Sequence, residues 1–206
     1  MKILEKKERR LGERLHLKGE RCLGAKCAAV RRNYPPGIQG KSKRRRASSE
    51  YSNLMREKQK VRFMYGLDAK DVARYSKEAV SKPGIFSQLF MRLVEGRLDN
   101  VVFRLGFADS RRIARQMVSH GHIAVDGKNL NIPSSRVKKG QVVSIKEKSL
   151  SSPLFSNLGA KLKKYEAPKW LNLEKDKRSG KVISLPEIDE GEVVADVMKI
   201  KEFYSR

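Results

Sequence analysis

The chain has 206 residues, of which 39% are hydrophobic and 34% are charged, and its 47 Lys and Arg outnumber its 23 Asp and Glu to give a formal net charge of +24. So large a positive charge opposes compaction unless a polyanion offsets it, which makes nucleic acid the expected partner and an anionic membrane surface the second. The apolar stretch at 85–94 contains Gln88 and Arg92 and is too short to cross a bilayer, which excludes it as a transmembrane helix.

The positive charge is concentrated in two segments. Residues 1–66 carry 20 Lys or Arg against 6 Asp or Glu, and residues 101–150 carry 10 against 3. A merely solvated surface would interleave the two signs more evenly, so these blocks indicate contact with phosphate groups.

Residues 1–46 are predicted to form a mostly extended basic arm, in which only the part near Leu11 to Leu17 is a candidate helix. The string YPPG at 34–37 and the string GKSKRRR at 40–46 combine prolines, glycines and basic residues that do not pack as a helix or a strand. We expect residues 31–46 to lie against RNA without regular structure, with Tyr34 stacked on a base or ribose, and to be disordered without RNA. The alternative for the run at 41–46 is a flexible solvated tail or a localisation signal.

Helices are predicted next, over 49–66, 68–82, 86–95 and 98–105. Ser48 or Ser49 can cap the first of them, and Gly66 ends it. Its apolar residues recur at spacings compatible with one face, which Lys58 interrupts. That face comprises Tyr51, Leu54, Val61 and Tyr65.

Residues 111–119 carry the clearest pattern, between a cap at Asp109 or Ser110 and a stop at Gly121. At a helical advance of about 100° per residue, the side chains fall on two opposite faces. One face holds Arg111, Arg112, Arg115 and Ser119, and the other holds Ile113, Ala114, Met117 and Val118. An ordinary amphipathic helix with a solvated basic face is the alternative. Since no acidic residue lies on the arginine face, and Arg pairs bidentately with phosphate oxygens, we favour a phosphate-binding face.

The pattern becomes extended after Gly121. Residues 122–125 and 128–132 are predicted to form a hairpin around Asp126-Gly127, and 141–146 a further strand. His120 and His122 have no third metal ligand near them in the sequence. We therefore expect His120 to hydrogen-bond RNA or to pack in a loop, and His122 to have a structural role at a strand edge.

Five separated strings carry a resemblance to a known family. The stretch RLDNVVFRLGFADSRRIARQMVSHGHIAVDGKNLNIPS at 97–134 resembles the S-four RNA-binding module. The strings ERCLGAKC, RRNYPPG, YSNLMREKQKVRFMYG and the terminal EFYSR resemble the bacterial small-subunit ribosomal protein of the S-four family. The resemblance is near-continuous from Leu15 to Ser149, looser over 150–202, and matches again at the C-terminus.

The resemblance implies an α+β protein with four parts. After the basic arm at 1–46 comes a helical rRNA-binding domain at 47–96, completed by the C-terminal return of 186–206, and the S-four module is inserted at 97–185. The resemblance also implies a cytoplasmic, structural constituent of the small ribosomal subunit that binds its ribosomal RNA early and nucleates assembly of the subunit body. Ribosomal proteins S-five and S-three, and messenger RNA near its entry path, are the further implied partners. The S-five contact is implied to influence translational accuracy.

The residues expected to bind ribosomal RNA combine the charge pattern with this resemblance. They are Arg31, Arg32, Tyr34, Lys43, Arg44, Arg45, Arg46, Tyr51, Arg56, Lys58, Gln59, Arg62, Arg111, Arg112, Arg115, Ser119 and His120.

An RNA-modifying enzyme is the main rival hypothesis, because some such enzymes also carry the S-four module. The segments before residue 96 show neither a phosphate-cradling glycine-rich loop nor a nucleophile paired with a base. Asp99 and Asn100 lie in a predicted helix, which favours a structural role over a catalytic one. Residues 150–206 read as polar and irregular, so we expect no enzyme, no cofactor and no small-molecule substrate. A membrane-surface binder would need an exposed apolar stripe, whereas the stripe opposite the arginines is needed for the core.

The two cysteines, Cys22 and Cys27, cannot form a disulfide framework and are expected to be reduced. In zinc-bearing members of the family such a pair is joined by an upstream Cys-x-x-Cys, at positions where this chain has Glu5 and Glu8. A structural zinc site needs four good ligands, usually thiolates or imidazoles. Two thiolates with two flexible glutamates near a chain terminus would bind the ion poorly, so we predict no zinc.

Overall fold

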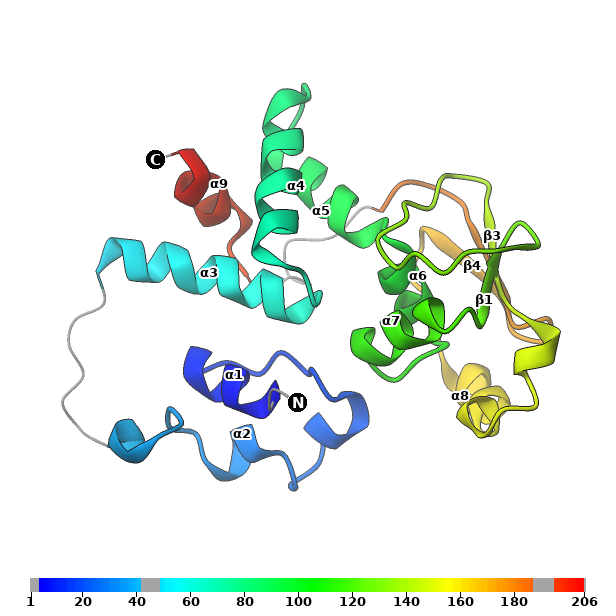
Figure 1. Cartoon of the computed structure of the whole chain (residues 1–206), viewed down its shortest axis with the longest axis horizontal. Coiled ribbons are helices and arrows are strands. Elements are labelled where there is room, and N and C mark those ends of the chain that lie inside the picture. Colours follow the sequence, from blue (N-terminus) through cyan, green and yellow to red (C-terminus); the bar gives the residue numbers. More distant parts are fainter. Residues whose placement is uncertain (1–3, 42–48, 187–194, 206) are drawn as a thin grey trace. The chain divides into compact units, whose positions relative to one another are not determined.

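The computed structural model describes residues 4–41, 49–186 and 195–205 (Figure 1). The chain forms two compact units, one made of residues 1–90 with 188–206 and the other of residues 91–187. Both helices and an antiparallel sheet are present, so the α+β prediction is confirmed. No helix in the described ranges is long and apolar enough to cross a membrane.

The first unit begins with a folded segment instead of the predicted extended arm. Three leucines, Leu11, Leu15 and Leu17, are buried and pack against Phe63 and Met64. The elements of this segment are helix α1 (Leu4–Leu11), the 3₁₀ turn η1 (Gly19–Cys22), the short helix α2 (Ala28–Arg31) and the 3₁₀ turn η2 (Ile38–Lys41). The prediction of an extended arm is therefore wrong for residues 4–41, as is the helix near 11–17, because the leucines fold the segment back on itself. Residues 42–46 lie outside the described ranges.

Three longer helices among the described residues lie wholly in the first unit. They are α3 (Glu50–Met64), α4 (Ala69–Ser81) and α9 (Val197–Ser205), and α9 packs on both α3 and α4 (Figure 1). The side chain of Ser49 caps α3 by accepting a hydrogen bond from the Ser52 N–H at 3.3 Å. Leu54, Val61 and Tyr65 are buried as predicted, but Tyr51 is 54% exposed.

Buried Lys60 ties α3 to other parts of the same unit. Its ammonium pairs with Glu13 at 2.6 Å and with Glu57 at 2.8 Å. Burial by itself would lower the pKa of Lys60, but hydrogen bonds and Coulombic attraction from these two carboxylates outweigh it and raise the pKa. The other oxygen of Glu57 accepts the Asp196 N–H at 2.9 Å, so a single ionic cluster joins the N-terminal segment, α3 and the start of α9.

The second unit has its core between helices and a sheet. Helix α5 (Phe86–Glu95) contains the division between the units, and α6 (Leu98–Arg104) and α7 (Arg111–Ser119) follow it. The boundaries of these helices confirm the predicted ones to within one or two residues. Val101, Val102, Leu105 and Met117 lie in the core against the sheet residue Ile123.

The sheet has five antiparallel strands in the order β2-β1-β3-β5-β4. The strands are β1 (Ile123–Val125), β2 (Lys128–Asn129), β3 (Val142–Ile145), β4 (Leu171–Glu174) and β5 (Ser179–Val182). The first three were predicted, but β4, β5 and helix α8 (Leu158–Lys164) occupy a region expected to be irregular. That expectation is wrong because apolar residues of this polar stretch, such as Leu171 in β4 and Val182 in β5, reach the core.

Glycine is required at Gly180 in β5. A Cβ placed there would lie 2.2 Å from the side chain of Leu105, which is fully buried. The close approach of the backbone of β5 to α6 therefore depends on the absent side chain.

Candidate RNA-binding surface

Helix α7 presents a polar edge to solvent and an apolar face to the core. The hydroxyl of Ser110 caps the helix by accepting the Ile113 N–H at 3.4 Å. Ala114, Met117 and Val118 are buried, as predicted, and Ile113 is partly buried against the same core. Arg112, Ser119 and His120 are exposed, while Arg111 and Arg115 are half-buried. The predicted division of the helix into two faces is thus confirmed.

Two of the three arginines do have acidic partners, contrary to the sequence argument. The Nη2 of Arg111 lies 3.7 Å from the buried carboxylate of Glu95, and the Nη1 of Arg115 lies 3.8 Å from that of Asp99. Neither acid belongs to α7, since Glu95 ends α5 and Asp99 lies in α6, and so the pattern along α7 could not reveal them. Arg112 is therefore the arginine of α7 whose exposure makes it the clearest candidate for phosphate.

Asp99 has the structural role that the sequence favoured. Arg97 binds it with two hydrogen bonds, from Nε at 3.0 Å and from Nη2 at 2.8 Å, and both side chains are buried. A buried carboxylate held in this way is compensated by charge and by hydrogen bonds, which is what makes its burial tolerable. It is not placed as a catalytic aspartate.

The two histidines beyond α7 differ in their surroundings. His122 is half-buried, with its Nδ1 3.0 Å from the hydroxyl of Ser149 and its ring edge-on to Phe155. His120 is exposed, with its ring 6.1 Å from that of His122. His122 thus holds a strand edge in place, whereas His120 extends the exposed edge that begins at Arg112.

Helix α3 carries a second set of predicted residues. Tyr51 and Arg56 are exposed, and Gln59 and Arg62 are partly exposed and hydrogen-bonded to each other at 3.3 Å. Lys58, by contrast, is 9% exposed, with its ammonium 3.7 Å from the ring centre of Phe203. Burial, and to a smaller extent the nearby Arg62, lowers the pKa of Lys58. Lys58 therefore does not belong to an exposed RNA surface, which corrects the prediction, because the aromatic rings of Phe203 and Tyr204 cover its charged group.

The N-terminal segment contributes exposed Arg31 and Arg32. Tyr34 is partly buried, with Arg9 4.9 Å and Lys41 5.4 Å from its ring centre. The Nε of Arg9 also donates to the carbonyls of Arg32 and Tyr34 at 2.9 and 3.0 Å. Sequence reasoning missed Arg9, whose only signal was its place in a charged run. The predicted residues Lys43, Arg44, Arg45 and Arg46 lie outside the described part of the chain.

Glu8, Cys22 and Cys27 form a buried cluster whose ligand atoms all lie within 4.8 Å of one another. The premise that the glutamates are flexible is wrong: Glu8 is 1% and Glu5 8% exposed. One oxygen of Glu8 accepts the N–H groups of Leu15 and Leu17 at 3.0 and 3.2 Å, while its other oxygen has no hydrogen-bond partner.

This cluster does not meet the ligand requirement of a structural zinc site. It supplies three ligands among the described residues, and such sites are closed by four. Glu5, at the fourth position, is instead paired with Lys18 at 3.0 Å and Arg21 at 3.5 Å. Burial raises the pKa of the Cys22 thiol, and the nearby Glu8 and Cys27 raise it further.

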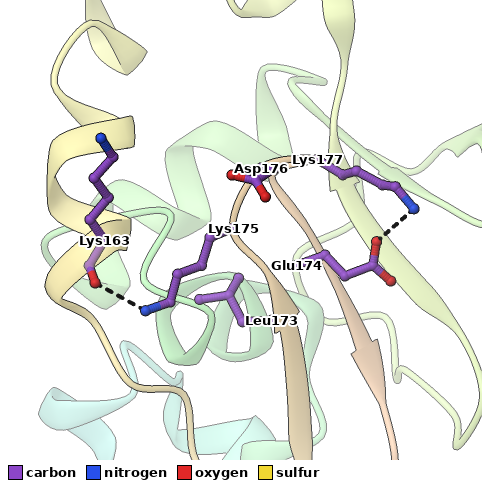
Figure 2. Close-up of a pocket in the computed structure, with 6 residues that line it drawn as sticks. All are labelled: Lys163, Leu173, Glu174, Lys175, Asp176 and Lys177. Carbon is purple, nitrogen blue, oxygen red and sulfur yellow. Dashed lines mark hydrogen bonds and ion pairs between the residues drawn. The ribbon is translucent and has the colours of Figure 1, made fainter.

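An open hollow between the end of α8 and the β4–β5 turn is lined mostly by charged residues (Figure 2). The ammonium of Lys175 crosses it to the carbonyl of Lys163 at 3.0 Å, and Glu174 pairs with Lys177 at 3.1 Å. Its remaining lining residues are Leu173 and Asp176, so it contains no Ser, Cys or His.

Comparisons with known proteins identify the family of this chain. Residues 4–95 match the family model described as the ribosomal protein S4/S9 N-terminal domain, and residues 96–143 match the S4 domain. The chain is 45% identical over 198 residues to the small ribosomal subunit protein uS4 of Halothermothrix orenii and 46% identical over 202 residues to that of Acetivibrio thermocellus. It is 43% identical over 198 residues to that of Thermus thermophilus. Each match covers 96% of this chain and 94% of the relative. The chain therefore belongs to the uS4 family of small ribosomal subunit proteins, whose S4 domain here contains helix α7 and its arginines.

Proposed function

We propose that this chain is a structural constituent of the small ribosomal subunit and binds its ribosomal RNA. The observation that carries the proposal is the exposed cationic edge of α7, which lies in the part of the chain that matches the S4 domain. The chain is not an enzyme, and as part of the ribosome it works in the cytoplasm.

The edge of α7 has the chemistry that phosphate recognition requires. Arg112 is exposed, and its guanidinium group can donate two parallel hydrogen bonds to one phosphate. Ser119 and His120 add hydroxyl and imidazole donors along the same edge, and the partly exposed Arg111 and Arg115 add positive charge. Contacts of this kind position a protein on RNA without reading its sequence.

The first unit supplies a second RNA-binding surface in this proposal. Its members are Tyr51, Arg56, Gln59 and Arg62 on α3, Arg31, Arg32 and Tyr34 before it, and the basic run at 43–46. In this assignment the first unit is the helical rRNA-binding domain, to which the C-terminal residues return, and the second unit is the inserted S-four module.

The finer functions rest on family resemblance. We propose that the chain binds early and nucleates assembly of the subunit body, that it contacts ribosomal proteins S-five and S-three, and that it contributes to the messenger RNA entry path. We further propose that its S-five contact supports accurate decoding. A stop-codon readthrough reporter tests this: mutations that break the S-five contact should raise misreading, and unchanged accuracy after verified loss of that contact would refute the idea.

Replacement of Arg112 tests the RNA-binding surface directly. Arg112→Ala in the full chain should weaken binding to a small-subunit rRNA transcript, and one lost phosphate contact should reduce the slope of log affinity against log salt by about 0.7–0.9. Stability should change by no more than about 0.5 kcal/mol, since the side chain is exposed. Gln116→Ala is the matched control, because Gln116 is exposed on the same helix and uncharged. An unchanged slope for Arg112→Ala would refute the assignment of this surface.

The number of copies of the chain per small ribosomal subunit distinguishes this function from RNA modification. A structural constituent should co-purify with small subunits at one copy each, whereas a modifying enzyme should be present at far less than one copy.

A further inference from the structure

A buried hydrogen-bond network connects α7 to α6. Asn100 in α6 is 2% exposed, and its amide group bridges two charged side chains. Its Nδ2 donates to the carboxylate and to the backbone carbonyl of Glu95, and its Oδ1 accepts a hydrogen bond from the Nε of Arg111 at 2.7 Å. All of these residues belong to the second unit.

We infer that Asn100 is a positioning residue for RNA binding, which fixes the guanidinium group of Arg111 in a phosphate-ready orientation. The inference rests on the proposed function. RNA binding at the surface then depends on Asn100, a residue in the interior of the fold. Asn100 itself is buried and does not touch RNA in this proposal.

The guanidinium group of Arg111 is held from three directions. Asn100 accepts from its Nε, Glu95 lies 3.7 Å from its Nη2, and its central carbon lies 4.5 Å from the ring centre of Phe103. An arginine side chain has many rotamers, and part of this rotamer freedom is lost when it binds. A group already held in place loses less on binding, so its contact with phosphate is stronger.

The positive charge of this cluster is accessible to solvent through Arg111. Glu95 is completely buried, with a second and closer partner in Arg104 at 2.7 Å. One carboxylate thus faces two guanidinium groups, and the cluster keeps an excess positive charge. The Arg111 side chain is 18% exposed, so this charge reaches solvent beside the exposed Arg112.

Asn100→Ala tests the positioning role without changing the net charge of the protein, because both side chains are uncharged. We expect this variant to weaken binding to the small-subunit rRNA transcript by up to about tenfold, because an Arg111 side chain no longer held by Asn100 loses more rotamer freedom when it contacts phosphate. The salt slope should fall by up to about 0.7–0.9, as for loss of the Arg111 phosphate contact. In an Arg111→Ala background the same Asn100→Ala change should weaken binding less than about twofold, since the group that it positions is gone.

Arg111→Lys provides a second variant that leaves the buried Asn100 in place. Lysine keeps the positive charge but lacks the Nε donor that Asn100 accepts, so binding should weaken to a similar extent as in Asn100→Ala. Thermal melting identifies the temperature range in which each variant is folded, and binding is compared within that range. If Asn100→Ala does not fold, folded Arg111→Lys that binds as the unmodified chain does overturns the inference, because lysine lacks the Nε donor to Asn100.

The outcomes separate this inference from the proposed function. If Arg112→Ala lowers the salt slope while folded Asn100→Ala or Arg111→Lys binds as the unmodified chain does, the RNA surface stands and the positioning role is overturned. Equal losses from Asn100→Ala with and without Arg111 would also overturn it, because the effect would not pass through that arginine. A loss that depends on Arg111 supports it.

Discussion

The buried carboxylate of Glu8 should hold the N-terminal segment in its folded form. One of its oxygens accepts the N–H groups of Leu15 and Leu17, at 3.0 and 3.2 Å, and both leucines are buried. Glu8→Ala leaves these two donors without a partner in the interior, at a cost of about 1–3 kcal/mol each. We therefore expect a local loss of about 2–6 kcal/mol.

Native-state amide exchange measures this loss where it occurs. A loss of only about 2 kcal/mol corresponds to roughly 30-fold faster exchange at the amides of Leu15 and Leu17. Glu8→Gln keeps a carbonyl oxygen for both donors and should retain more protection than Glu8→Ala. Glu20→Ala is the control, because Glu20 is exposed in the same segment. Unchanged protection of the two amides in Glu8→Ala would refute the reasoning, since it would mean that the leucine cluster holds the segment unaided.

Three further predictions concern the core, the cysteines and a turn. Met117→Ala should destabilise the second unit by about 2–5 kcal/mol, because Met117 is 2% exposed, while the salt slope of the folded protein stays unchanged in titrations with RNA. The free protein should hold no tightly bound zinc by elemental analysis, and one equivalent that disappears in Cys22→Ser would contradict this. The Val142 N–H and the Gln141 amide hold the pKa of exposed Asp126 below its usual value of about 3.9. The stability that this carboxylate contributes is therefore present above about pH 4 and lost as the pH falls through its lowered pKa, which an NMR titration of its carboxyl carbon can follow.

The sequence by itself determined the elements that depend on local periodicity. Helix α7 was predictable because its apolar and basic residues repeat at helical spacing and a serine precedes it as a cap. The same logic located α3 to α6 and the first three strands. The charge blocks identified a polyanion as the partner, because net charge does not depend on how the chain folds.

Only the tertiary structure decided which charges are available at the surface. Glu95 and Asp99 reach Arg111 and Arg115 from other helices, and Phe203, from the far end of the chain, covers Lys58. A periodicity argument treats each helix as though its polar face met only solvent, so it cannot find a partner that comes from another element.

The same reason explains the folded N-terminal segment and the missed strands. Residues 4–41 are rich in charge, and what folds them is a leucine cluster together with the buried carboxylate of Glu8, whose partners lie beyond α1. Strands β4 and β5 have too few apolar residues to stand out, and they form because β5 pairs with β3 and Gly180 admits Leu105. Contacts between residues distant in sequence stabilise both regions, and the three-dimensional fold alone brings those residues together.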